Sequence, residues 1–173
     1  MIDPRVIAID TNLFTLILLH SWLHSMKQNA AQRQRRIGEV WGRQDAITVE
    51  QFDGLGTLFL SAKRRIVTQH VVAEALNSRV RKRFPEWFAA LELTRKHQID
   101  EVGCCVADLL PHNEFRKLMK DLGPTDAGLI YVAENEGATI ISDDGHLRQC
   151  AEARLVHVIG LANLDYSPLR LNG

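Results

Sequence analysis

The sequence predicts an α/β fold in three layers, in which helices cover both faces of a central parallel sheet. Short apolar, β-branched runs occur at residues 5–9, 65–68 and 138–142, and each precedes a segment of helical character. Strands that alternate with helices in this way are typical of parallel sheets, whose carboxyl edge collects the residues that follow each strand.

The first strand, residues 5–9, leads into an apolar helix that begins after Asn12. The apolar face of this helix is so broad that it predicts either deep burial in the core or a protein interface. Residues 25–63 are more than a plain crossover needs, and they are rich in Ala, Gln and Arg before apolar stretches within 49–60. We therefore expect a helical insertion near 25–63 rather than a disordered linker.

The second strand, residues 65–68, precedes a helix that contains Glu74. Farther along the chain, a Gly-Pro pair stops one segment, and Thr125 is a candidate N-cap for a helix over 127–136. The third strand, residues 138–142, follows this helix and ends in a turn.

Four acidic residues occupy positions that this topology brings toward one edge of the sheet. They follow a strand or lie in a helix next to one: Asp10, Glu74, Asp126 and Asp144. Carboxylates held within a few ångströms repel one another, so at least one binds a proton unless a cation lies between them. Oxygen donors without cysteine favour Mg²⁺ or Mn²⁺ over zinc. Such a cation polarises a phosphoryl oxygen and activates water, so the matching reaction is phosphodiester hydrolysis.

Each acid also has an ordinary structural explanation. Asp10 and Asp126 suit a helix N-terminus, where unpaired N–H groups and the macrodipole favour a carboxylate. Asp144 lies in an Asp-Asp-Gly turn, and Glu74 falls about 60° outside the apolar arc of its helix, where a solvated side chain is expected. Caps and turns do not predict that acids recur at the carboxyl edge, and this recurrence favours the metal site.

Four short blocks of the sequence resemble the ordered signature of PIN-domain nucleases. The blocks begin at Val6 (VIAIDTN), Thr68 (TQHVVAE), Thr125 (TDA) and Ser142 (SDDGHL). Their order and spacing carry the resemblance, since any one block by itself is weak. It extends from about residue 5 to residue 159, and it implies a single PIN-like nuclease domain over residues 1–173.

The resemblance assigns metal binding and catalysis to the four acids, with Asp144 binding the metal directly or through water. It also implies that Asn12 and Ser142 support the acids by hydrogen bonds. The last block of the family usually reads Thr-x-Asp-x-x-Leu, so Ser142 is a conservative departure and Asp144, rather than Asp143, falls on the pattern. Asp143 stays open as an additional member of the site.

The net charge gives no general argument for a nucleic-acid partner, because 21 lysines and arginines balance 21 aspartates and glutamates. Basic residues are nevertheless clustered, and two clusters supply candidate contacts to nucleic-acid phosphates: Arg33, Arg35 and Arg36, and Arg79, Arg81, Lys82 and Arg83. A third cluster, residues 63–65, precedes the second strand. A solvated helix face is the alternative explanation for each cluster.

Other metal chemistries have less support in the sequence. His20 and His24 are spaced i, i+4 on the first helix, a geometry that can hold zinc, but the Glu that a metalloprotease motif places after its first His is missing. His146, two residues after Asp144, is the histidine closest in sequence to the proposed acidic centre, where it could contact phosphate, although a turn-surface histidine is the simpler explanation.

Length and composition indicate one globular domain. A chain of 173 residues with 46% apolar content can bury a real core, and no repeat divides it. The three cysteines form neither a Cys-x-x-Cys pair nor a disulfide framework. We expect a cytoplasmic protein with no membrane partner, because no secretory leader or long apolar segment is evident.

The prediction is therefore a PIN-like endoribonuclease that hydrolyses RNA phosphodiester bonds with Mg²⁺ or Mn²⁺. The family resemblance alone implies RNA rather than DNA, homodimerisation, and a role as the toxin of a toxin–antitoxin pair with an antitoxin partner; the insertion weakens the toxin assignment. Two rivals stay open. One is a structure-specific DNA nuclease or phosphatase on a related fold, and the other is a non-catalytic PIN-like binding module whose acids only cap helices.

Overall fold

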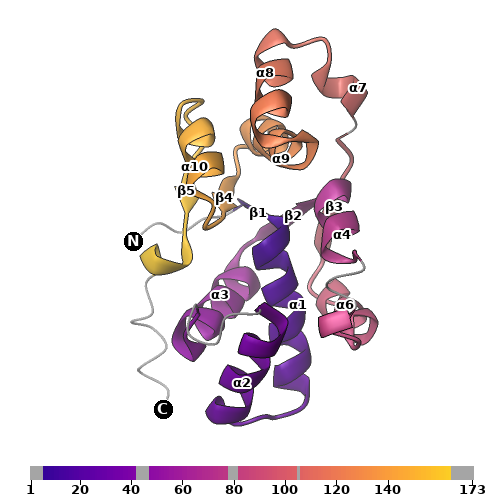
Figure 1. Ribbon diagram of the computed structural model, residues 1–173, viewed down its shortest axis with the longest axis vertical. Helices are drawn as coiled ribbons and strands as arrows, with labels where there is room; N and C mark the ends of the chain where they lie inside the picture. Colours follow the sequence, from indigo (N-terminus) through magenta and orange to yellow (C-terminus); the bar gives the residue numbers. More distant parts are fainter. Residues whose placement is uncertain (1–5, 42–46, 78–81, 105, 165–173) are drawn as a thin grey trace.

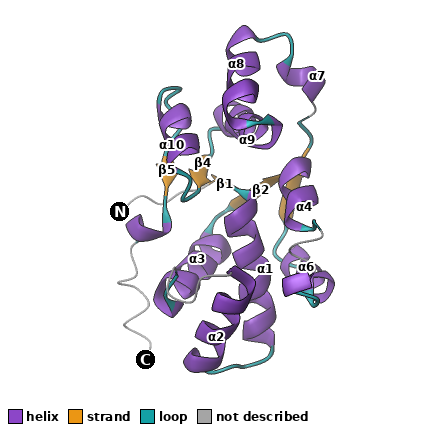
Figure 2. Ribbon diagram, viewed as in Figure 1, coloured by secondary structure: helices purple, strands orange, loops and turns teal. Residues whose placement is uncertain are grey.

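The sheet lies at the centre of the molecule, between two groups of helices (Figures 1 and 2). The computed structural model describes residues 6–41, 47–77, 82–104 and 106–164. Within them, five strands pair in parallel in the order β3-β2-β1-β4-β5. Their bounds are β1 (Val6–Ile9), β2 (Arg64–Thr68), β3 (Ile99–Val102), β4 (Thr139–Ile141) and β5 (Val158–Ile159). The predicted three-layer α/β/α fold with a parallel sheet is confirmed.

The strand order reverses between β1 and β4. From β1 the chain adds β2 and β3 on one side, and it then returns to add β4 and β5 on the other side. Connections on the two sides leave the carboxyl ends in opposite directions, so a crevice opens at the point of reversal. This topology selects the carboxyl ends of β1 and β4 as the place for a ligand.

Successive strand residues face opposite layers of the molecule, as the pleat requires. Ile7 and Ile9 of β1 belong to one buried cluster, whereas Ala8 between them belongs to a second. Strands β2 and β4 alternate in the same way. The apolar runs read as buried strands therefore feed two separate cores, one on each face of the sheet.

The helices of the first face gather around α1 (Thr11–Ser25), which is buried along most of its length. Those that share its core are α2 (Ala30–Trp41), α3 (Val49–Ser61), α4 (Gln69–Ala75) and α6 (Trp87–Arg95). The broad apolar face of α1 is thus covered by its own chain. Helices α2 and α3 also confirm the predicted helical insertion, although residues 42–46 within it lie outside the described residues.

The second face is built on α9 (Pro124–Glu136), whose buried residues pack on the central strands. It is flanked by α7 (Val106–Leu109), α8 (Asn113–Leu122) and α10 (Gly145–Glu152). The short 3₁₀ helix η1 (Leu161–Asn163) follows β5 and packs against α3 on the first face. No helix in the described ranges is long and apolar enough to cross a bilayer.

Two details differ from the sequence prediction. Helix α9 begins at Pro124 rather than at residue 127, with Gly123 (φ 90°) as its N-cap, so Thr125 lies inside the first turn and does not cap the helix. Proline is well suited to the first position of a helix because it has no N–H to leave unpaired there. Strand β3, at the edge of the sheet, was not predicted.

Candidate metal centre

The four predicted acids lie on four separate segments at the carboxyl edge of the sheet, near the point where the strand order reverses. Asp10 directly follows β1, and Asp144 lies shortly after β4. Glu74 belongs to α4, which follows β2, and Asp126 lies in the first turn of α9. Electrostatic repulsion links them, since Asp126 interacts with both Asp144 and Glu74, and Asp10 with Asp126. The fold therefore places them in one acidic centre.

Asp10 is the most buried of the four, with 5% of its surface exposed. Its Oδ1 accepts a hydrogen bond of 2.7 Å from the Leu13 N–H, so it caps α1, and its own N–H donates to the Ile141 carbonyl at the end of β4. Burial, with smaller contributions from repulsion by Asp126 and Asp143, raises the pKa of Asp10 to about 6, although the hydrogen bonds from Leu13 and Ser142 lower it. A capping role alone would lower this pKa.

Glu74 is held by two threonines on different elements. The Thr11 hydroxyl at the beginning of α1 donates to one carboxylate oxygen at 2.9 Å, and the Thr125 hydroxyl in α9 donates to the other at 2.9 Å. The side chain of Glu74 therefore does not extend freely into solvent, although the residue is exposed. It connects α1, α4 and α9 at the carboxyl edge.

Asp126 shows the clearest electrostatic sign of crowding. Burial, together with repulsion from Asp144 and Glu74, raises its pKa to about 6, while His146 opposes the shift. The effect of His146 places this histidine near the acids, where its position in the sequence predicted it. Bringing a positive charge to Asp126 therefore stabilises its ionised form.

Ser142, Asp143 and Asp144, which follow β4, make different hydrogen bonds. Asp144 caps α10, since its Oδ1 accepts from the N–H groups of His146 and Leu147 at 2.7 and 3.0 Å. The Ser142 hydroxyl is fully buried; it accepts from the Asp144 N–H at 3.0 Å and bonds to Asp10. The predicted supporting role of Ser142 thus has a geometric basis. Asp143 instead accepts from the Leu161 N–H at 2.7 Å, which joins the ends of β4 and β5.

Asn12 lies exposed in the first turn of α1. Among the described residues, no hydrogen bond joins its amide to the four carboxylates. The support that the resemblance assigned to Asn12 is provided here by Thr11, one residue earlier.

The arginines of α2 lie away from the acidic centre and are already paired. Arg33 donates to Asp53 at 2.6 Å, Arg35 pairs with Glu39, and Arg36 pairs with Glu39 and Glu86. Helix α2 lies beside the C-terminal half of α1, the end farther from Asp10 (Figure 1). The structure does not bring these three arginines to the acids.

The other basic clusters differ in position. Lys82 and Arg83 are exposed on the segment after α4, whereas Arg79 and Arg81 lie outside the described residues. Arg64 begins β2, at the opposite edge of the sheet from the acids, where it pairs with Asp100 and Glu136. Of the basic residues predicted to contact nucleic-acid phosphates, Lys82 and Arg83 are therefore the described ones that follow Glu74 closely in the chain.

The donor set of the acidic centre fits a hard divalent cation. All four side chains offer carboxylate oxygens, the ligands that Mg²⁺ and Mn²⁺ prefer. Repulsion among the acids contributes to the raised pKa values of Asp10 and Asp126, so a bound cation would favour their ionised forms. Among the described residues the four carboxylates are not drawn together within 4.8 Å of one another; threonines or backbone N–H groups hold three of them individually.

Comparisons with protein-family models, with curated proteins and with solved structures found no match to this chain. The geometry of the site and the resemblance of the sequence blocks are therefore the observations from which a function can be inferred. Sequence reasoning missed Thr11 and Thr125 as partners of Glu74; each stands next to one of the predicted aspartates, which was the available signal.

Proposed function

We propose that this chain is a PIN-like nuclease that hydrolyses RNA phosphodiester bonds with Mg²⁺ or Mn²⁺. The observation that carries the proposal is the meeting of four carboxylates from four segments at the point where the strand order reverses. Helix ends and turns explain Asp10, Asp126 and Asp144 one at a time, but they do not explain why Asp126 is close enough to Asp10, Glu74 and Asp144 for their charges to interact.

The residues of such a site would have different roles. Asp10, Asp126, Glu74 and Asp144 would hold the cation, and the hydroxyl groups of Thr11 and Thr125 orient Glu74. When bound, Mg²⁺ or Mn²⁺ supplies positive charge to a phosphoryl oxygen and lowers the pKa of water for attack on phosphorus. His146, whose charge interacts with Asp126, would donate a hydrogen bond to a phosphate oxygen.

Phosphate contacts in this proposal come from the segment after α4. Lys82 and Arg83 are exposed there, eight and nine residues after Glu74. Contacts of this kind hold a polyanion without reading its sequence. RNA as the substrate, and a toxin role with an antitoxin partner, rest on the family resemblance. Growth arrest on expression of the wild type, absent with Asp126→Asn, is the result expected for a toxin.

The first experiment compares three substrates: labelled single-stranded RNA, flapped DNA and a small phosphate ester. Purified full-length chain is incubated with each in Mn²⁺, Mg²⁺ or chelator. We expect RNA cleavage that chelator abolishes. Cleavage of flapped DNA or of the ester in preference to RNA would contradict the RNA assignment and support the first rival.

Asp126→Asn tests the acidic centre itself, and Asp100→Asn is its matched control. Asp100 is a half-exposed aspartate of β3 that pairs with Arg64, away from the crevice. The nuclease proposal expects loss of cleavage and of Mn²⁺ binding in Asp126→Asn alone. Unchanged cleavage in Asp126→Asn, with both variants folded, would leave the acids as caps and turns.

A further inference from the structure

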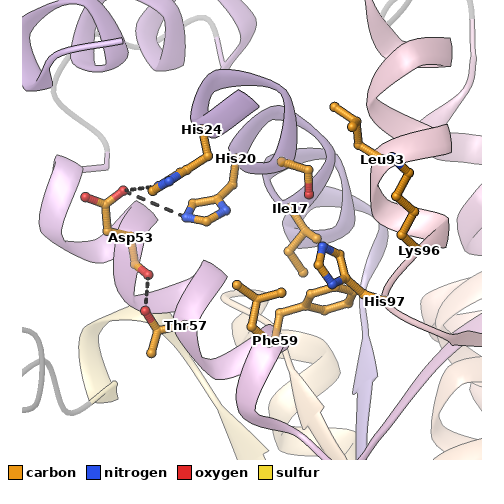
Figure 3. A pocket seen from close by; sticks show the side chains of 11 residues that line it. Ile17, His20, His24, Asp53, Thr57, Phe59, Leu93, Lys96 and His97 are labelled. Carbon is orange, nitrogen blue, oxygen red and sulfur yellow. Dashed lines mark hydrogen bonds and ion pairs between the residues drawn. The ribbon is translucent and has the colours of Figure 1, made fainter. Parts of the chain in front are cut away.

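A second candidate metal site lies on the first face of the molecule, apart from the acidic centre. Figure 3 shows His20 and His24 of α1 directed toward Asp53 of α3. Among the residues that the structure describes, these three form the group whose ligand atoms all lie within 4.8 Å of one another. We propose that His20, His24 and Asp53 bind a zinc-type divalent transition metal, and that Arg33 competes with the metal for Asp53.

The distances are close to those of a tetrahedral site. The Nε2 atoms of His20 and His24 lie 3.9 and 3.6 Å from the Asp53 Oδ1. Ligands bound to zinc at 2.0–2.2 Å with tetrahedral angles stand about 3.4 Å from one another. The two imidazole–carboxylate distances therefore need to shorten by only a few tenths of an ångström, and α1 already holds the two imidazoles on one face, with ring centroids 4.1 Å apart.

The donor chemistry separates this site from the acidic centre. Two imidazole nitrogens and one carboxylate favour zinc and its neighbours in the transition series over Mg²⁺. Both imidazoles direct their Nε2 atoms toward the Asp53 carboxylate (Figure 3).

The i, i+4 histidine pair alone was weak support, because the sequence places no acid beside it. The fold provides the missing ligand from residue 53, in the helical insertion, one turn of α3 before Gly56. A Cβ atom on Gly56 would lie 2.2 Å from the His20 ring, so glycine permits this close approach of α3 to the imidazole. The insertion thus supplies Asp53, the third ligand, to the two histidines of α1.

Arg33 stands where the metal charge would lie. Its Nη1 donates to the Asp53 Oδ1 at 2.6 Å and lies 3.3 Å from the His24 Nε2. The arginine is not ideally held there, since its Nε is buried without a hydrogen-bond partner in the described structure. Two positive groups cannot share one carboxylate at this distance without repulsion, so metal binding requires the guanidinium to leave Asp53.

The three ligands border a cavity of about 410 Å³. Its apolar lining includes Ile17, Phe59 and Leu93, and Lys96 and His97 also face it (Figure 3). Three protein ligands leave a tetrahedral ion one further position, a pattern found where water or a small ligand completes the coordination. The cavity gives such a ligand room.

The test measures Zn²⁺ and Co²⁺ binding to the metal-free, full-length chain, with excess Mg²⁺ present to occupy the acidic centre. Competition with a coloured chelator gives Zn²⁺ affinity and stoichiometry, and the visible spectrum of Co²⁺ reports tetrahedral coordination. We expect one Zn²⁺ per chain. Loss of a ligand in His24→Gln or Asp53→Asn should weaken binding by more than the roughly 10- to 100-fold that loss of an outer-shell partner costs.

Four further variants make the test specific. Arg33→Gln should tighten binding several-fold, because the competing charge is removed. His97→Gln, in the same cavity, Asp126→Asn, in the acidic centre, and Cys150→Ser should leave Zn²⁺ affinity unchanged. His24 has 53% of its side chain exposed, so its replacement is compatible with folding.

The opposite results would overturn the proposal. These are wild-type affinity in His24→Gln, weaker binding in Arg33→Gln, loss of Zn²⁺ in Asp126→Asn or Cys150→Ser, or binding by Arg33→Gln when the wild type binds none. None of them bears on RNA cleavage, so the two proposals fail or stand separately.

Discussion

A carboxylate that is buried beside other carboxylates destabilises the folded chain when it is ionised. Burial, followed by repulsion from Asp144 and Glu74, raises the pKa of Asp126 from 3.8 to about 6. A raised folded-state pKa contributes stability that is fully present below pH 3.8 and is lost as the pH rises through 6. Metal-free protein should therefore lose stability across this interval.

Asp126→Asn should remove this loss. The full shift corresponds to about 3 kcal/mol, but partial exposure and the favourable position of an acid in a helix's first turn reduce the expected gain to roughly 1 kcal/mol at neutral pH. Near pH 4 the gain should vanish. Urea denaturation in chelator measures both values, with Asp100→Asn as the control that gains nothing. A variant less stable than the wild type at neutral pH would contradict the crowding of these acids.

Thr125 offers a second test at the residue scale, because its hydroxyl fixes one oxygen of Glu74. Thr125→Val keeps the shape of the side chain and removes the donor, whereas Thr125→Ser keeps the donor. Loss of an orienting partner should weaken Mn²⁺ binding about tenfold or more, as measured by calorimetry, while Thr125→Ser stays near the wild type. Equal weakening in both variants would assign the effect to packing rather than to the hydrogen bond.

At the scale of elements, the contact of α1 with α3 depends on the missing side chain of Gly56. Gly56→Ala would force the buried His20 ring to move. Overpacking of this kind costs about 1–3 kcal/mol, against a gain of up to about 1 kcal/mol from better helix propensity. We expect a net decrease in stability and a Tm lower by a few degrees.

Gly145→Ala is the matched control, since a Cβ at the beginning of α10 would meet nothing within 4 Å. Thermal unfolding followed by circular dichroism compares the two alanine variants. A Gly56→Ala protein as stable as Gly145→Ala would show that α3 can move away from α1 without a decrease in thermal stability.

The elements differ in how far the sequence reveals them. Strands β1, β2 and β4 are buried on both faces, so their apolar runs are visible without knowledge of their neighbours. Strand β3 contains Asp100 and Glu101, which hide the apolar signal; Asp100 is stabilised there by Arg64 of β2, a partner 36 residues away. His157, directly before β5, is exposed. Whether such residues at the edge of the sheet belong to a strand depends on contacts with distant residues, which the local sequence pattern does not show.

The two candidate sites also differ in how far local sequence reveals them. The acidic centre could be predicted because each acid follows a local signal, and the sheet topology brings these signals together. The hydrogen bonds of Glu74 join residues 63 and 51 positions apart, and Asp53 reaches the histidine pair only through the packing of α3. Such pairings depend on tertiary structure, so they stay invisible in the sequence.

At the scale of the whole molecule, α1 joins the two candidate sites. Its N-terminus lies at Asp10 and its C-terminal half carries His20 and His24, along a helix of 15 residues, or about 22 Å. The helices of the insertion share the buried core of α1. Unfolding of the insertion would expose this core, so the described chain should unfold as one unit.

Two optical probes test this unity. Trp22, Trp41 and Trp87 all pack against the core of the first face, so their fluorescence reports that face alone, whereas far-ultraviolet circular dichroism reports helices on both faces. Coincident thermal transitions are expected. Mg²⁺ bound at the acidic centre should raise both midpoints together, since a ligand at 100 times its Kd adds about 2.7 kcal/mol to the folded state. A fluorescence transition that precedes the circular dichroism, or that does not respond to Mg²⁺, would instead make the helices of the first face a separate folding unit.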